Sequence, residues 1–203
     1  MQPLFEMAAK DLNVPVALTK AIAEVESRHS PYALNIGGKG YFFDSKEDAI
    51  LVARQAMAEG KSLDSGLMQV NSQWLKRFNI PLEAALDPEA NVYLGTWLLK
   101  ENYQVHGDWQ TAVARYHSPD QKRGQRYLDK VKAVLGGTEE NLSEKLQREK
   151  PSQNDQVPLT PLVISQNMTT SERFVQRPRK VLQRRKQIEE PEENSLVTFV
   201  RRK

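Results

Sequence analysis

Apolar residues return at helical spacing in one segment after another between residues 3 and 135, and this spacing limits the possible folds more than any other feature. In residues 14–27 the apolar side chains recur every three or four positions, at Val14, Leu18, Ala21, Ile22 and Val25. Such a pattern is typical of a helix that buries one face. The sequence therefore predicts a mainly α domain.

Capping residues and helix breakers divide this region into segments. We expect helices over 3–13, 15–27, 46–58, 67–79, 88–106, 109–116 and 122–135, with Pro15 and Pro88 in first turns, Ser45 and Asp108 as N-caps, and Gly107, Gly136 and Gly137 as stops. The glycine-rich stretch NIGGKGYFF at 35–43 predicts a small β-hairpin between two of these helices.

The composition changes after Gly137. Residues 138–203 contain five prolines and few aromatic residues, which makes a packed core hard to build. This segment has 13 of the 29 Lys and Arg residues and 10 of the 26 acidic ones, so residues 1–137 keep 16 of each and the net charge of +3 belongs to the tail. We expect a domain at 1–137 and a basic, largely disordered tail at 138–203, whose exception is the β-prone run SLVTFV.

Composition also excludes several classes of protein. A core without excess positive charge disfavours nucleic-acid binding. No apolar run reaches the roughly 18 residues of a transmembrane helix. The chain has no cysteine, and His29, His106 and His117 have no metal-ligand spacing, so we do not expect a metal site. The first residues, MQPLFEMAAKDLN, lack the features of a signal peptide.

Glu26 is the first candidate for chemistry. It follows the apolar stripe of residues 14–25, so its carboxyl should border both the core and a cleft. Burial disfavours the ionised form of a carboxyl and raises its pKa, as a general acid requires. The alternative is a solvated Glu26, or one that pairs with Arg28.

Two further motifs attract attention. In GLMQVN, at 66–71, Gly66 permits unusual backbone angles, and Leu67, Met68 and Val70 can anchor a loop to the core. Gln69 and Asn71 offer amide groups that could bind a sugar. The segment could equally be the first turn of a helix.

In VARYHSP, at 113–119, Tyr116 ends a helix. Its phenol could reach a carboxyl across a cleft, or it could simply lie half-buried in the core. His117 is expected at the surface or rim.

The order VESRHSPYALN, GLMQVN, EANVYLGTWLL and ARYHSP resembles the catalytic domain of soluble lytic transglycosylases, from Leu4 to Leu135. It is most similar to the short versions encoded with conjugation, type IV secretion and pilus systems, which also carry an insert like NIGGKGYFFDSKEDA. The resemblance implies a lysozyme-like helical fold that cleaves the β-1,4 bond between N-acetylmuramic acid and N-acetylglucosamine.

The resemblance also implies roles for individual residues. By this match Glu26 is the catalytic acid and base, Ser27 supports it, Asn91 helps to hold the site together, and Tyr116 faces the acid. The sugar site is lined by Gly66, Leu67, Met68, Gln69 and Asn71. His117 departs from the family, which usually has Asn after this tyrosine. Glycosidases commonly use two carboxyls, and here only Asp64 could be a second one. The resemblance implies that a single carboxyl is enough, and that the reaction forms 1,6-anhydro ends without water or a cofactor.

Two other functions stay open at this point. A hydrolytic muramidase on the same fold would use Asp64 to position water and would leave reducing ends. A non-enzymatic wall-binding protein would keep the fold without turnover, although binding alone does not require an acid beside an apolar stripe. For the favoured function we expect peptidoglycan glycan strands as substrate, a periplasmic or wall-associated location, local wall opening for a secretion, conjugation or pilus apparatus, and contact with that apparatus through the tail.

Overall fold

The computed structural model describes residues 2–136, and this part of the chain is predominantly helical. In chain order its elements are α1 (Gln2–Leu12), α2 (Val16–Ser27), β1 (Leu34–Ile36), β2 (Lys39–Tyr41), α3 (Lys46–Ala58), β3 (Leu63–Ser65), β4 (Val70–Asn71), α4 (Ser72–Phe78), α5 (Leu82–Ala85), α6 (Pro88–His106), α7 (Trp109–His117) and α8 (Gln121–Leu135). The predicted mainly α fold with a small hairpin is therefore confirmed. The tail at 138–203, with SLVTFV, lies outside the described residues.

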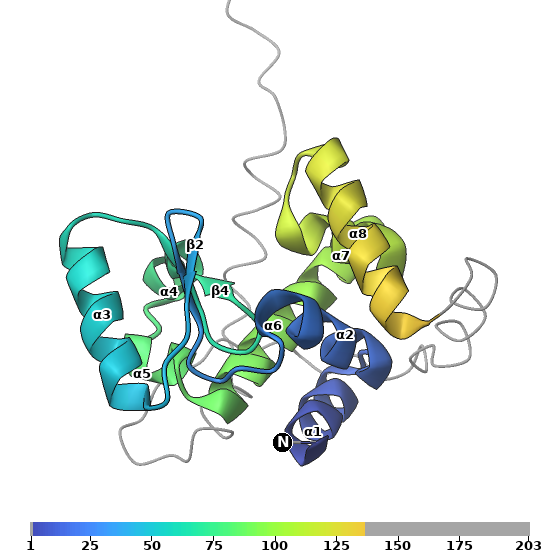
Figure 1. Ribbon diagram of the computed structural model, residues 1–203. Helices are drawn as coiled ribbons and strands as arrows, with labels where there is room; N and C mark the ends of the chain where they lie inside the picture. The colour runs from blue at the N-terminus through green and yellow to red at the C-terminus, as the bar shows by residue number, and fades with distance from the viewer. Residues whose placement is uncertain (1, 137–203) are drawn as a thin grey trace, which may run out of the picture. The chain divides into compact units, whose positions relative to one another are not determined.

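Helix α6 is the central element of the fold. It packs against α1, α2 and α7 on one side and against α5 and β4 on the other, as its place in the middle of the ribbon shows (Figure 1). Every residue from Ala90 to Leu99 is buried, including Asn91 and Thr96. A helix enclosed on both sides cannot keep a single apolar stripe, so its polar residues must find partners inside the protein.

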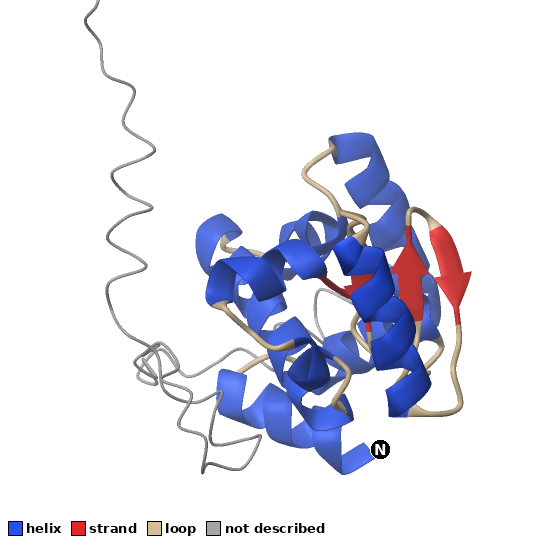
Figure 2. Cartoon of the chain, turned by 90° about the vertical axis from the view of Figure 1, so that its left-hand side faces the viewer, coloured by secondary structure: helices blue, strands red, loops and turns tan. Residues whose placement is uncertain are grey.

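The four strands form one antiparallel sheet in the order β2-β1-β3-β4 (Figure 2). The hairpin β1-β2 is the one predicted from the glycine-rich stretch: Gly37 and Gly38, at its turn, both have positive φ, of 61° and 86°. Two-residue hairpin turns favour such angles at both central positions. Strands β3 and β4 were not predicted, and they bring Asp64 opposite Asn71.

The predicted helix at 67–79 is wrong in its first five residues. Residues 66–69 form a turn between β3 and β4, and α4 begins only at Ser72. The Asn71 side chain accepts a hydrogen bond of 2.9 Å from the Gln73 amide and so acts as the N-cap. The reading of GLMQVN as the first turn of a helix is therefore incorrect.

The predicted ends of the longer helices agree well with the structure. Ser45 and Asp108 are N-caps, Pro88 opens α6, and Gly107 ends it in the left-handed conformation. Two differences are small: Pro15 is the residue before α2 rather than its first, and the short helix α5 was not predicted. None of the helices within residues 2–136 combines the length and the apolar character that a membrane-spanning segment requires.

Candidate active site

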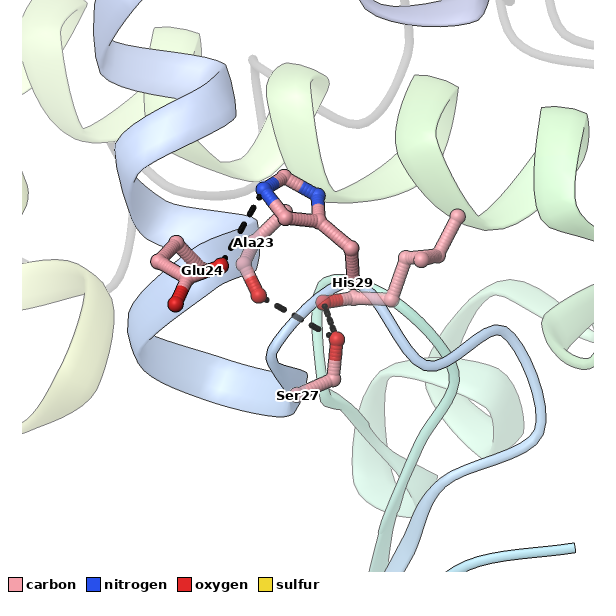
Figure 3. A network of polar contacts seen from close by, with 5 residues as sticks. Ala23, Glu24, Ser27 and His29 are labelled. Carbon is pink, nitrogen blue, oxygen red and sulfur yellow. Dashed lines mark hydrogen bonds and ion pairs between the residues drawn. The ribbon is translucent and has the colours of Figure 1, made fainter. Parts of the chain in front are cut away.

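The turn at 66–69 is the centre of the candidate site, and α2 reaches it through Ser27. The Ser27 hydroxyl is buried and lies 2.9 Å from the main-chain oxygen of Leu67 and 3.2 Å from that of Ala23 (Figure 3). The first of these contacts joins the last residue of α2 to a segment 40 residues later. Ser27 therefore fixes the turn relative to the helix that carries Glu26.

Asn91 holds the same turn from α6. Its side-chain oxygen accepts a hydrogen bond of 2.7 Å from the Met68 amide, and its nitrogen donates to the carbonyls of Ser65 and Ala85 at 2.8 and 2.7 Å. A Cβ atom on Gly66 would lie 2.4 Å from that nitrogen. A glycine is thus required here both for space and for its φ of 76°.

Tyr116 binds the turn from the end of α7. Its hydroxyl donates a hydrogen bond of 2.7 Å to the Met68 carbonyl. A phenol has one proton to donate. Tyr116 donates it to this main-chain carbonyl and not to a carboxyl, the partner that the sequence had suggested. Burial, and then the nearby charges of Glu26 and Asp64, raise the pKa of Tyr116 well above its usual value, so the phenol stays neutral.

Gln69 closes the turn on itself. Its side-chain nitrogen donates to the carbonyls of Gly66 and Ala33, at 2.9 and 3.2 Å, and its φ of 45° is unusual for a residue other than glycine. Leu67 and Met68 are fully buried, as predicted for anchors. The donor groups of the Gln69 amide are therefore engaged within the protein rather than held out for a sugar.

One glycine of the site was missed by the sequence analysis. Gly95 lies on the buried side of α6 against Met68, and a Cβ atom there would come within 2.4 Å of the Met68 Cβ. Because glycine usually weakens a helix interior, its presence in EANVYLGTWLL was a possible signal of close packing. Gly95 lets the turn approach α6 closely enough for Asn91 to bind it.

Glu26 lies in the last turn of α2, with its side chain half-buried. Burial raises its pKa from 4.5 to about 7; an interaction with Tyr127 lowers it, the Asp64 charge raises it and the Lys130 charge lowers it. Near neutral pH both the acid and the base form of the carboxyl are therefore available. No ion pair joins Glu26 to Arg28 in the described part of the chain, where Arg28 is an exposed left-handed cap.

Asp64, on β3, is the second carboxyl of the site. It accepts a hydrogen bond of 2.7 Å from the Asn71 side chain. Burial raises its pKa, whereas Asn71 and the charge of His117 lower it. The charge of Asp64 raises the pKa of Glu26, so the ionised form of Asp64 favours the protonated form of Glu26.

Tyr127, on α8, is the other residue that the sequence analysis missed. Its side chain is buried, and its hydroxyl interacts with the Glu26 carboxyl. In the sequence it falls on the apolar stripe of the last helix, with Leu128 and Val131, and so it resembles an ordinary core residue. Only the packing of α8 against α2 reveals its proximity to Glu26.

Glu26, Asp64, Tyr116 and Tyr127 thus come from α2, β3, α7 and α8, and meet beside a turn that three side chains hold in place. No group of three or more potential metal ligands occurs within residues 2–136. The family model described as the transglycosylase SLT domain matches residues 3–133. The chain belongs to this family.

Curated relatives are similar over a shorter segment. The type IV secretion system protein virB1 of Brucella abortus, Brucella melitensis and Brucella suis is 31% identical over 86 residues, which are 41% of this chain and 36% of the relative. The matched segment thus spans little more than a third of the length of these relatives. No solved structure was found to match the chain.

Proposed function

We propose that this protein is a peptidoglycan lytic transglycosylase that cleaves the β-1,4 bond between N-acetylmuramic acid and N-acetylglucosamine. The observation that carries the proposal is the Glu26 carboxyl, whose pKa burial raises to about 7 in a chain of the transglycosylase SLT family. A group that both donates and accepts a proton works best when its pKa lies near the operating pH. Glu26 meets this requirement, and no cofactor is needed.

The reaction would proceed in two steps at Glu26. The protonated carboxyl gives its proton to the glycosidic oxygen as the bond to the muramyl carbon breaks, and the substrate's own N-acetyl group stabilises the resulting cation. The carboxylate then removes the proton from the muramyl 6-hydroxyl, whose oxygen attacks the same carbon. The product is a 1,6-anhydro end, water is not consumed, and Glu26 regains its proton.

The neighbouring groups would support this cycle. Ser27, Asn91 and Tyr116 hold the turn of Gly66, Leu67, Met68 and Gln69, which we propose as the wall of the sugar site together with Asn71. Tyr116 is neutral and its proton is engaged, so its role is to position the Met68 carbonyl. We propose no proton transfer through it.

Asp64 favours a second candidate function. Its carboxyl, on β3, acts electrostatically on Glu26 of α2, as the second acid of a hydrolytic muramidase would. Its hydrogen bond with Asn71 suggests instead a structural role beside the sugar site. In the transglycosylase mechanism Asp64 has no chemical step, because the substrate supplies the nucleophile.

Substitution of each carboxyl tests the assignment. Glu26→Gln should lower the rate of wall solubilisation by about 10² to 10⁴-fold, the usual contribution of general acid–base catalysis. Asp64→Asn should retain most of the rate. Glu24→Gln is the matched control, since Glu24 lies on the same helix and pairs with His29 (Figure 3). Full activity of Glu26→Gln would refute the proposal, and an equal loss with Asp64→Asn would favour the hydrolase.

We propose that the enzyme acts on the wall from the periplasm and that it opens the wall locally for a type IV secretion or related apparatus. Support comes from the similarity to virB1 of Brucella, which is named a type IV secretion system protein. We further propose that residues 1–137 are the catalytic domain, because every site residue named above lies before Gly137. Residues 138–203 would then serve contacts with the apparatus.

A further inference from the structure

His117 is the residue of this region to which the proposed reaction gives no role. It ends α7, its side chain is exposed, and its imidazole lies parallel to the Tyr127 ring. The ring centroids are 4.6 Å apart and the planes differ by 4°. An exposed side chain has many conformations available, so a stacked one reports a specific contact between α7 and α8.

The ring of Tyr127 is buried, but few contacts determine the position of its hydroxyl. Its side chain is 4% exposed, and within the described residues no hydrogen bond with a good distance and angle is made by its hydroxyl. The group with which this hydroxyl does interact is the Glu26 carboxyl. A small rotation or shift of the ring would therefore decide how well the phenol donates to Glu26.

We infer that His117 is a positioning residue, which acts by stacking on Tyr127 and so holds its hydroxyl against the Glu26 carboxylate. The inference rests on the proposed function only in so far as Glu26 is the catalytic group. A donor held against a carboxylate stabilises its ionised form, the form that removes the proton in the second step. His117 would thus help to set the pH at which Glu26 changes from acid to base.

In this proposal His117 acts on Tyr127 through the packing of its ring and not through its charge. The charged groups that face it are Lys130 and Asp64, with Arg123 further contributing. Partial burial of the ring, together with Lys130, lowers the pKa of His117 below its usual 6.5. The imidazole is therefore neutral above pH 7. The groups that shift the pKa of Glu26 are Tyr127, Asp64 and Lys130, and His117 is not among them.

The direct test is the titration of the Glu26 carboxyl, followed by NMR in the full-length protein labelled with ¹³C at the glutamate carboxyl. Glu26→Gln identifies the signal. We expect His117→Ala to move the midpoint upward by about one pH unit, since a hydrogen bond to a charged group is worth about that much. His117→Phe, which keeps a ring for stacking, should leave the midpoint unchanged.

Two double variants separate positioning from charge. Tyr127→Phe removes the hydroxyl and should raise the midpoint by itself, and His117→Ala should then add nothing to it, because both act through one contact. Lys130→Gln removes an independent positive charge, so its upward shift should add to that of His117→Ala. Unchanged melting temperatures would show that α7 and α8 keep their packing.

Three results would overturn the inference: no shift in His117→Ala, an equal shift in His117→Phe, or full additivity of His117→Ala with Tyr127→Phe. The titration needs no substrate, so its result is independent of whether the protein cleaves peptidoglycan. If the proposed function holds, the alkaline limb of the rate profile should move with the midpoint in each variant. If it fails, the NMR midpoints still test the contact.

Discussion

Replacement of Glu26 by Gln should make the protein more stable at alkaline pH. In the folded state the Glu26 pKa lies at about 7, whereas the ordinary value for a glutamate carboxyl is 4.5. The folded protein therefore keeps a proton between these two pH values that the unfolded chain has released, and the stability falls as the pH rises through this window. The loss is complete above pH 7, where the folded protein holds a half-buried carboxylate with reduced access to solvent.

The size of the effect follows from the difference between the two pKa values. A gap of about 2.5 between 4.5 and about 7 corresponds to about 3 kcal/mol, at about 1.4 kcal/mol for each pH unit. Gln cannot ionise, so a protein with Gln at position 26 does not lose this stability as the pH rises. Glu26→Gln should therefore match the parent protein near pH 4.5 and exceed its free energy of unfolding by up to about 3 kcal/mol at pH 8.5.

Urea denaturation at a series of pH values measures this difference directly. Other groups that titrate, Asp64 among them, contribute to both curves and largely cancel when the variant is compared with the parent. Glu24→Gln, on the same helix, should show no such gain at pH 8.5. A difference between Glu26→Gln and the parent that did not change with pH would refute the argument, as would a loss of stability at pH 8.5.

Two other substitutions test how the turn at 66–69 is held. Gly95→Ala places a methyl group where Met68 already lies, so the free energy of unfolding should fall by about 1–3 kcal/mol and wall solubilisation should slow. Gly40→Ala is the control, because its new methyl group would meet its nearest atom at 3.9 Å. Its free energy of unfolding, measured by the same urea titration, should stay within about 0.5 kcal/mol of the parent value. Ser27→Ala leaves the buried Leu67 carbonyl without this donor, which should cost about 1–3 kcal/mol in the same assay; an unchanged midpoint would show that the hydroxyl is not needed.

The sequence predicted the long helices well because local chemistry determines where they begin and end. Asp108 accepts a hydrogen bond of 2.7 Å from the Thr111 amide, and Gly107 takes the left-handed conformation, as the residue types suggest. Strands β3 and β4 could not be found in this way. Strand β3 has three residues and β4 has two, and β3 pairs with β1, which lies on the other side of α3 in the sequence, as well as with β4.

The site could be predicted only in part for a similar reason. Glu26 is signalled by the apolar stripe before it, and Gly66 by its place in the motif GLMQVN. Tyr127 and Gly95 have the sequence surroundings of ordinary helix residues, and their importance arises from what α8 and α6 pack against. The same holds for Tyr116, whose partner, the Met68 carbonyl, is a main-chain group 48 residues away.

The proposed reaction, in which Glu26 cleaves the glycan strand without water, can be checked from the chemistry of the new glycan ends. Purified sacculi digested with the full-length protein can be analysed by mass spectrometry, with the Glu26→Gln variant as the control. We expect this reaction to give 1,6-anhydro-muramyl ends with the parent protein and almost none with the variant. Reducing ends from the parent protein, or equal yields of anhydro ends from both, would contradict it.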